Sequence, residues 1–170
     1  MEEKMNGKIW IKAMGCFLIT LITVTVLSNI GHAESQVPLW KSQTIYVPIY
    51  SHIYLTDKRK IKLDLSVTLS IRNTDAGKPI TFHTVDYFNS EGTLVKKFIT
   101  KPHTLQPMSS SYFTIEESDT TGGWGANFIL EWKSDDKITE PVIEAIHSGA
   151  RGTHSYIFDT QGKVIKGVYE

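Results

Sequence analysis

Residues 62–72, KLDLSVTLSIR, alternate strictly between polar and apolar side chains, and this pattern constrains the fold more than any other part of the chain. Successive side chains of a β-strand point to opposite faces, so the pattern predicts a strand with one buried and one solvated face. Such strands are typical of antiparallel sheets. The apolar positions are Leu63, Leu65, Val67, Leu69 and Ile71.

Eight further segments have the length and composition of short strands, and turn residues separate them. No stretch after Ala33 has a convincing helical pattern. We therefore expect an all-β domain, an antiparallel β-sandwich of the immunoglobulin-like kind, with a β-barrel as the alternative. The additional strands are expected at residues 44–54, 79–89, 93–99, 111–116, 126–132, 142–147, 153–158 and 163–169.

Several details of these strands are specific. Pro48 removes a backbone donor, so residues 44–54 are expected to form an edge strand, open to pairing with another chain, or to contain a bulge. Residues 79–89 are apolar on both faces, which suits a central strand. Residues 134–137 are expected to form a turn, and residues 153–169 a last hairpin.

The N-terminal segment has the pattern of an export signal. Lys4, Lys8 and Lys12 precede an uncharged run at residues 13–31, and Gly31-His32-Ala33 places small residues where signal peptidase reads them. Cleavage is expected after Ala33, with an uncleaved membrane anchor through residues 13–31 as the alternative. Both place the domain outside the cytoplasm, periplasmic or secreted. The expected organisation is a signal or anchor at 1–33, a polar lead-in at 34–42 and one β-sandwich domain at 43–170.

Charge and cysteine content exclude several kinds of site. The formal net charge is zero, with 18 basic and 18 acidic residues, so no nucleic-acid partner is expected. Cys16 is the single cysteine and precedes the apolar run, whereas the acylated cysteine of a bacterial lipoprotein follows it. The chain after Ala33 therefore offers no disulfide, thiol nucleophile or cysteine-based zinc site.

A glycine-rich loop within residues 116–132, EESDTTGGWGANFILEW, is the first candidate site. Its carboxylates and amide oxygens could contribute to a Ca²⁺ site, although no EF-hand spacing is present. The alternative is that Asp119 and its neighbours bond to nearby backbone and fix the turn. Trp124 either caps the core or stands exposed as a contact residue. The candidate binding residues here are Glu117, Asp119, Trp124 and Asn127.

An aromatic strip in residues 44–54 is the second candidate surface. Tyr50, His52 and Tyr54 share one face of the expected strand with Tyr46, because strand side chains alternate. Exposed, these rings would suit a sugar, a peptide or a partner strand. The alternative is a second buried face of the sandwich. His52 would act as a zinc ligand or a base only with another histidine beside it.

Motifs spread over the chain resemble a known family. The segments are VPIYSHIY at 47–54, LSIRNTD at 69–75, VDYF at 85–88, EESD at 116–119, GG at 122–123, GANF at 125–128, EW at 131–132 and EPVIEA at 140–145. Together they resemble bacterial exported proteins of the domain of unknown function 3124 family, over roughly residues 42–165. The resemblance implies export and agrees with the β fold, but it implies no activity. Many members look like lipoproteins, whereas this chain lacks a cysteine after its apolar run.

No catalytic motif stands out in the sequence. The chain has no Gly-x-Ser-x-Gly elbow, no HExxH and no glycine-rich phosphate loop. We expect a non-catalytic binding or interaction module of the cell envelope, with a protein or a glycan as partner and no bound cofactor, calcium excepted. The alternatives are a divalent-cation-binding domain and a hydrolase that uses Glu117 or Asp119.

Overall fold

The computed structural model describes residues 37–56 and 61–169, and every regular element in these ranges is a β-strand. The strands are β1 (Leu39–Pro48), β2 (His52–Tyr54), β3 (Lys62–Asp64), β4 (Ser66–Arg72), β5 (Ile80–Phe88), β6 (Leu94–Lys97), β7 (His103–Leu105), β8 (Ser110–Ile115), β9 (Asn127–Thr139), β10 (Val142–Arg151), β11 (His154–Gln161) and β12 (Lys163–Val168). Among these residues there is no helix long and apolar enough to cross a membrane.

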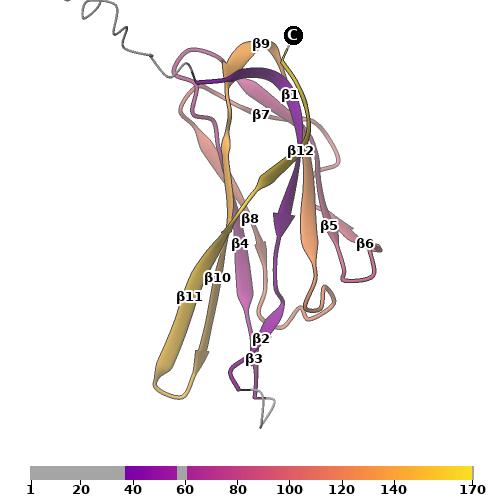
Figure 1. Ribbon diagram of the computed structural model, residues 1–170, viewed down its shortest axis with the longest axis vertical. Coiled ribbons are helices and arrows are strands. Elements are labelled where there is room, and N and C mark those ends of the chain that lie inside the picture. Colours follow the sequence, from indigo (N-terminus) through magenta and orange to yellow (C-terminus); the bar gives the residue numbers. More distant parts are fainter. Residues whose placement is uncertain (1–36, 57–60, 170) are drawn as a thin grey trace, which may run out of the picture. The chain divides into compact units, whose positions relative to one another are not determined.

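Two antiparallel sheets face each other (Figure 1). The first has the order β12-β1-β9-β5-β6, with β7 also paired to β5, and the second has the order β11-β10-β4-β8. Strands β2 and β3 form a separate pair at one end. The all-β, antiparallel expectation is confirmed. Each sheet has unpaired edges, so the described part of the chain is a sandwich and the barrel alternative is wrong.

The core lies between the two sheets. Phe82, Leu130 and Trp132 enter it from the first sheet, and Val67 and Leu69 from the second, each with at most 1 % of its surface exposed. The predicted buried face of residues 62–72 is confirmed at all five apolar positions. These residues nevertheless form two strands, because the backbone N–H of Leu65 bonds to the carbonyl of Ser51 between them.

The prediction of an edge strand around Pro48 is wrong. β1 is paired on both sides, to β12 and to β9, so it offers no free edge to another chain. Pro48 is the last residue of β1, where a missing N–H breaks no further ladder bond. The pairing with β12 is irregular between Thr44 and Ile45, so the strand does contain a bulge, but not at the proline.

Two expectations for interior strands are corrected by bulges. In β5 the register shifts between Phe82 and Thr84, which turns Val85 and Tyr87 toward the same core as Phe82. The strand is interior as expected, but a single face is buried. Residues 134–137, expected as a turn, lie within β9, where the pairing with β1 jumps from Lys133 to Ile138. The polar run therefore forms a bulge instead of ending the strand.

The last two strands do not form the expected hairpin. β11 pairs with β10, whereas β12 pairs with β1 in the other sheet, and Gly162 alone separates them. The hairpin that the structure contains is β10–β11. Residues 142–147, expected as a strand, form the start of β10. This hairpin ends near the β2–β3 pair, at the lower end of the molecule in Figure 1.

The N-terminal predictions lie mostly outside the described residues. The signal or anchor at 1–33, including the tether at 13–31 and Cys16, falls within the undescribed range 1–36. Within the predicted lead-in at 34–42, the structure assigns Leu39 onward to β1 and buries Trp40 to 7 % exposure. Residues 37–169 thus belong to one compact unit that begins before the predicted boundary at 43.

Candidate functional site

The glycine-rich loop is held by hydrogen bonds from two neighbouring segments. From the turn after β5, the backbone N–H and the hydroxyl of Ser90 both donate to the carbonyl of Gly122, and the N–H of Gly125 donates to the Ser90 hydroxyl at 2.8 Å. From the segment after β1, the backbone N–H and the hydroxyl of Ser51 both donate to the carbonyl of Gly123. The loop therefore has a defined position between β1 and β5.

Two of the three loop glycines are required by this geometry. Gly123 has φ +74°, a conformation that residues with a side chain adopt only under strain. A Cβ at Gly122 would overlap the hydroxyl of the buried Tyr87 and lie 2.8 Å from the Cβ of Ala126. The loop thus passes directly over the core, and it presents Trp124 on its outer side.

Trp124 is the centre of an aromatic cluster made of Tyr50, His52, Tyr54 and Trp124. The ring of Tyr54 stacks on Trp124 with centroids 5.8 Å apart and planes at 22°. Tyr50 and His52 approach the same indole edge-on, at 5.5 Å and 6.0 Å. His52 also contacts Tyr54 at 5.4 Å. The structure therefore joins the two candidate surfaces, predicted separately, into one.

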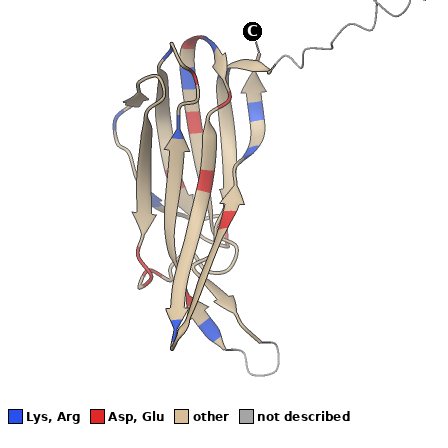
Figure 2. Ribbon diagram, turned by 90° about the vertical axis from the view of Figure 1, so that its left-hand side faces the viewer, with Lys and Arg blue, Asp and Glu red and all other residues tan. Residues whose placement is uncertain are grey.

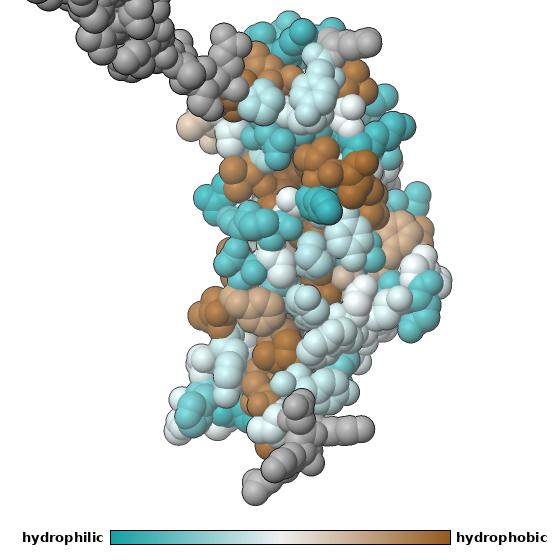
Figure 3. All heavy atoms as spheres, in the orientation of Figure 1, coloured by the Kyte–Doolittle hydropathy of each residue, from teal (hydrophilic) through white to brown (hydrophobic). Residues whose placement is uncertain are grey.

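The cluster is partly open to solvent. Trp124 and Tyr54 each have 48 % of their surface exposed, whereas Tyr50 and His52 are half-buried beneath them. Of the alternatives left by the sequence, Trp124 thus stands exposed, and the aromatic strip is not a second buried face. On the face in Figure 3, hydrophobic side chains occur in several groups separated by hydrophilic ones.

An ion pair of described residues lies beside the cluster. Lys62 Nζ lies 2.7 Å from Asp64 Oδ1 on β3, and β3 pairs with β2 so that Asp64 is opposite His52. Burial, and then the positive charge of Lys62, lower the pKa of His52, and Asp64 opposes this shift. At neutral pH the imidazole is therefore uncharged, and the surface offers polar but uncharged groups.

A buried histidine lies beneath the cluster, and the sequence suggested it only as one of four histidines, with His83, His103 and His154, that could accompany His52. His147 on β10 is fully buried, and its ring stacks on Phe158 of β11 with centroids 4.5 Å apart and planes at 3°. Tyr50 contacts both rings, at 5.7 Å and 6.2 Å. The signal was present, because in β10 His147 alternates in step with Ile143 and Ala145, which places it on the core face.

The acidic candidates do not converge on a single site. The Asp119 carboxylate accepts hydrogen bonds from the backbone N–H and the hydroxyl of Thr121, which is the local turn-fixing role left open as an alternative to calcium binding. Asp119 lines a hollow with Phe98 and Thr114, whereas Glu117 lines a separate one with Asp64. Within 37–56 and 61–169, no three His, Cys, Asp or Glu side chains are grouped to hold a metal.

Asn127 has a structural position at the start of β9. It pairs with Pro48 of β1 on one side and with Phe88 of β5 on the other. Asn127 thus lies next to the loop, as its place in the sequence implies, but the structure gives it a position in the ladder and not in the aromatic cluster. Of the seven candidate residues, four form the cluster: Tyr50, His52, Tyr54 and Trp124.

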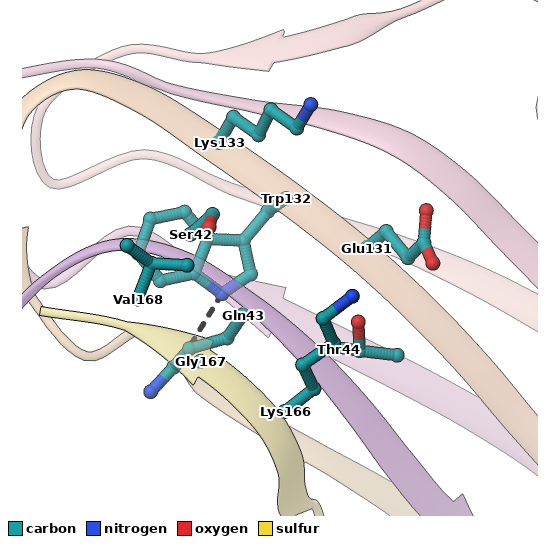
Figure 4. Close-up of a pocket in the computed structure, with 9 residues that line it drawn as sticks. All are labelled: Ser42, Gln43, Thr44, Glu131, Trp132, Lys133, Lys166, Gly167 and Val168. Carbon is teal, nitrogen blue, oxygen red and sulfur yellow. Dashed lines mark hydrogen bonds between the residues drawn. The ribbon is translucent and has the colours of Figure 1, made fainter.

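A further hollow, of about 310 Å³, lies at the other end of the first sheet, over β12, β1 and β9 (Figure 4). Its floor is a buried amide network in which Trp132 Nε1 donates to Gln43 Oε1 at 3.1 Å and Gln43 Nε2 donates to Glu140 at 2.9 Å. Lys133, Lys166 and Glu131 stand around it. Since the buried polar atoms of Gln43 and Trp132 are paired with each other, neither side chain leaves an unpaired polar atom for a ligand.

Comparisons with known proteins place the chain in a family. The family described as Protein of unknown function (DUF3124) matches residues 42–165. No curated protein matches the chain. One solved structure, described as the crystal structure of Thermotoga maritima 1070, has 13 % sequence identity and a TM-score of 0.43, and the similarity covers 74 % of this chain and 97 % of that one. That similarity is too low to support an argument. Because the family model spans most of the chain, including the loop and the aromatic strip, the protein belongs to the DUF3124 family.

Proposed function

We propose that this protein is a non-catalytic binding domain of the bacterial cell envelope and that the aromatic cluster is its contact surface. The observation that supports this is the convergence of three rings from residues 50–54 on Trp124, which is distant from them in the sequence. An isolated exposed aromatic residue needs no explanation, but two half-exposed rings that pack on each other, one of them on a hydrogen-bonded loop, form a prepared surface. The export pattern of residues 1–33 supports a location in the envelope.

The ligand class that fits best is a neutral glycan. Tyr54 and Trp124 offer flat apolar faces with polar tips, which match the alternating C–H and hydroxyl surfaces of a sugar ring. The neutral His52 and the self-paired Lys62 and Asp64 supply hydrogen-bonding groups without a net charge.

The wider surface supports the same choice. Acidic and basic residues are interspersed over the strands in Figure 2, in keeping with a formal net charge of zero. A nucleic-acid ligand would need a continuous basic surface.

For the fold, we keep the immunoglobulin-like sandwich as our proposal, supported by the crossings of the chain between sheets from β9 to β10 and from β11 to β12.

Calorimetric titration of the full chain with soluble chito-oligosaccharides and other neutral oligosaccharides tests the proposal. Binding of at least one of them is expected, and Trp124→Ala is expected to weaken it by at least about tenfold, as for a central aromatic contact. Tyr112→Ala is the matched control, because Tyr112 is 70 % exposed on β8 and makes no aromatic contact among those found.

Two results would contradict the proposal. One is the absence of binding across a broad panel of neutral glycans, combined with a protein partner whose affinity depends on Trp124. That result would mean that the ligand of the cluster is a protein and not a glycan. The other is glycan binding that Trp124→Ala and Tyr54→Ala both leave unchanged, which would place the contact surface elsewhere.

A further inference from the structure

The segment after β1 is joined to β10 by a hydrogen bond that a neutral imidazole alone can accept. The backbone N–H of Tyr50 donates to Nε2 of His147 over 3.1 Å. A backbone N–H cannot act as an acceptor, so Nε2 carries no proton. The neutral ring therefore has its proton on Nδ1.

Protonation of His147 would remove this bond. The second proton would sit on Nε2 and face the N–H of Tyr50, which places two donors opposite each other. His147 is fully buried, and within the described residues its Nδ1 has no hydrogen-bond partner, so the imidazolium would be a poorly compensated buried charge. Relief requires that Tyr50 or the β10–β11 hairpin move away.

Tyr50 transmits such a movement to the exposed surface. Its ring lies between His147, at 5.7 Å, and Trp124, at 5.5 Å. Trp124 in turn contacts Tyr54 and His52. A displacement of Tyr50 would therefore remove one of the three rings that fix the Trp124 side chain.

The groups around His147 oppose its protonation only in part. Burial is the largest influence and lowers the pKa of His147. The backbone carbonyls of Ala145 and Phe158 and the negative charge of Asp159 on β11 raise this pKa. Neither carbonyl is in hydrogen-bonding geometry with Nδ1. On β4, the residues opposite are the uncharged Val67 and Thr68.

The remaining charged groups on the neighbouring strands are already paired. Arg72 of β4 and Glu144 of β10 lie 3.3 Å from each other, and Arg151 of β10 donates to the carbonyl of Lys62. The Lys62–Asp64 pair and the neutral His52 stand on the β2–β3 side. None of these pairs gives His147 a carboxylate partner.

We propose that His147 is a pH-dependent contact that positions the aromatic cluster: the neutral ring holds Tyr50 against Trp124, and the protonated ring releases it. The inference rests on the proposed function only where it concerns ligand affinity. The cluster is thus ordered at neutral pH and loosened in acid, and a ligand bound there would be released as the surroundings acidify.

Nuclear magnetic resonance of the full chain tests this without a ligand. Between pH 8 and 5, the indole N–H signal of Trp124, assigned with Trp124→Phe, is expected to shift with one midpoint below the ordinary histidine value of 6.5. The ring nitrogen signals of His147 should show the Nδ1–H form at pH 8 and titrate with the same midpoint. The indole signal of the buried Trp132 reports whether the core stays folded.

Two variants separate His147 from its neighbours. His147→Gln retains an acceptor for the Tyr50 N–H but cannot titrate, so when it is combined with His52→Gln the Trp124 signal should become independent of pH. His52→Gln removes the other histidine next to Trp124 and should leave the titration in place. With a glycan that binds, affinity should fall at least about tenfold from pH 7.5 to 5.5 in the wild-type protein and stay constant in His147→Gln.

Three outcomes would overturn the inference. They are an Nε2–H form of His147 at pH 8, a Trp124 titration that persists when His52 and His147 are both replaced by Gln, and a Trp124 signal constant down to the pH at which the Trp132 signal changes. If His147→Gln does not fold, the tautomer and midpoint in the wild-type protein decide. A Trp124 titration without any glycan binding would leave this contact standing and the proposed function refuted.

Discussion

At the scale of single residues, the position of Trp124 depends on how closely the loop backbone approaches the core. Gly122 is buried against Tyr87, whose hydroxyl has no hydrogen-bond partner within the described residues, and burial is the main cause that raises the pKa of this phenol. A Cβ at Gly125, three residues on, would make only ordinary contacts, with its nearest atom, the Ser90 hydroxyl oxygen, at 3.6 Å. These two glycines of one loop thus differ in how well they tolerate an added side chain.

Gly122→Ala is therefore expected to destabilise the domain by about 1–3 kcal/mol, the usual cost of added volume in a packed site. That corresponds to a fall of several degrees in melting temperature. Gly125→Ala is the matched control, because its Cβ would make only ordinary contacts, and it should change stability by less than about 0.5 kcal/mol. Urea denaturation of both variants measures the difference. Equal stabilities would show that the loop can move off Tyr87.

At the scale of elements, local pattern predicted strands better than it predicted their partners. Residues 62–72 alternate so regularly that their buried face could be read directly, and the structure confirms it. The pairing of strands was harder to predict. Whether β1 is an edge or an interior strand depends on β12, which pairs Val168 with Ser42, 126 residues earlier in the chain. The bulge in β5 was also hidden, because Ile80 to Phe88 contains no glycine or proline that would mark it.

The candidate site shows the same division. The sequence identified the ring-bearing segment and the glycine-rich loop as separate features, because each has a distinctive composition. Their contact depends on hydrogen bonds from Ser51 and Ser90 to the loop, and isolated serines in turns give no signal of such a role. The place of His147 on the core face could be predicted from the alternation of β10. Its hydrogen bond with Tyr50 could not, since Tyr50 lies 97 residues away.

The loop's dependence on the β5–β6 turn gives an element-scale prediction. Ser90→Ala removes the hydroxyl that donates to Gly122 and accepts from Gly125, while the backbone bond from the Ser90 N–H to Gly122 remains. We expect the Gly125 amide to exchange with solvent at least about tenfold faster, while core amides are unaffected, because local opening needs less free energy than unfolding. Ser118→Ala, at an exposed loop serine, is the control. Unchanged exchange at Gly125 would show that the bonds from Ser51 and from the Ser90 backbone hold the loop without the Ser90 hydroxyl.

At the scale of the whole molecule, stability should depend on pH through groups whose pKa values the fold shifts. The fold lowers the pKa values of His52 and His147, mainly by burial, so below the ordinary histidine value of 6.5 the unfolded chain binds more protons than the folded one. The fold also lowers the pKa of Asp75, chiefly through the Gly77 N–H, with help from the amides of Thr139 and Lys78. Both effects have the same sign: the free energy of unfolding decreases as pH falls.

The two effects act in different pH ranges, so denaturation curves can separate them. The histidine contribution is fully present above pH 6.5 and is lost as pH falls from there, whereas the Asp75 contribution is present above its ordinary value of 3.8 and is lost below it. Urea unfolding of the wild-type protein should therefore show stability falling from pH 7 to 5, and again below pH 4. His147→Gln should flatten the first fall and Asp75→Asn the second, while His154→Gln, at an exposed residue of the β10–β11 turn, should change neither. A wild-type stability that is constant between pH 7 and 5 would mean that His147 is protonated as easily in the fold as in water, and the hydrogen bond from Tyr50 would then have no bearing on the stability of the domain.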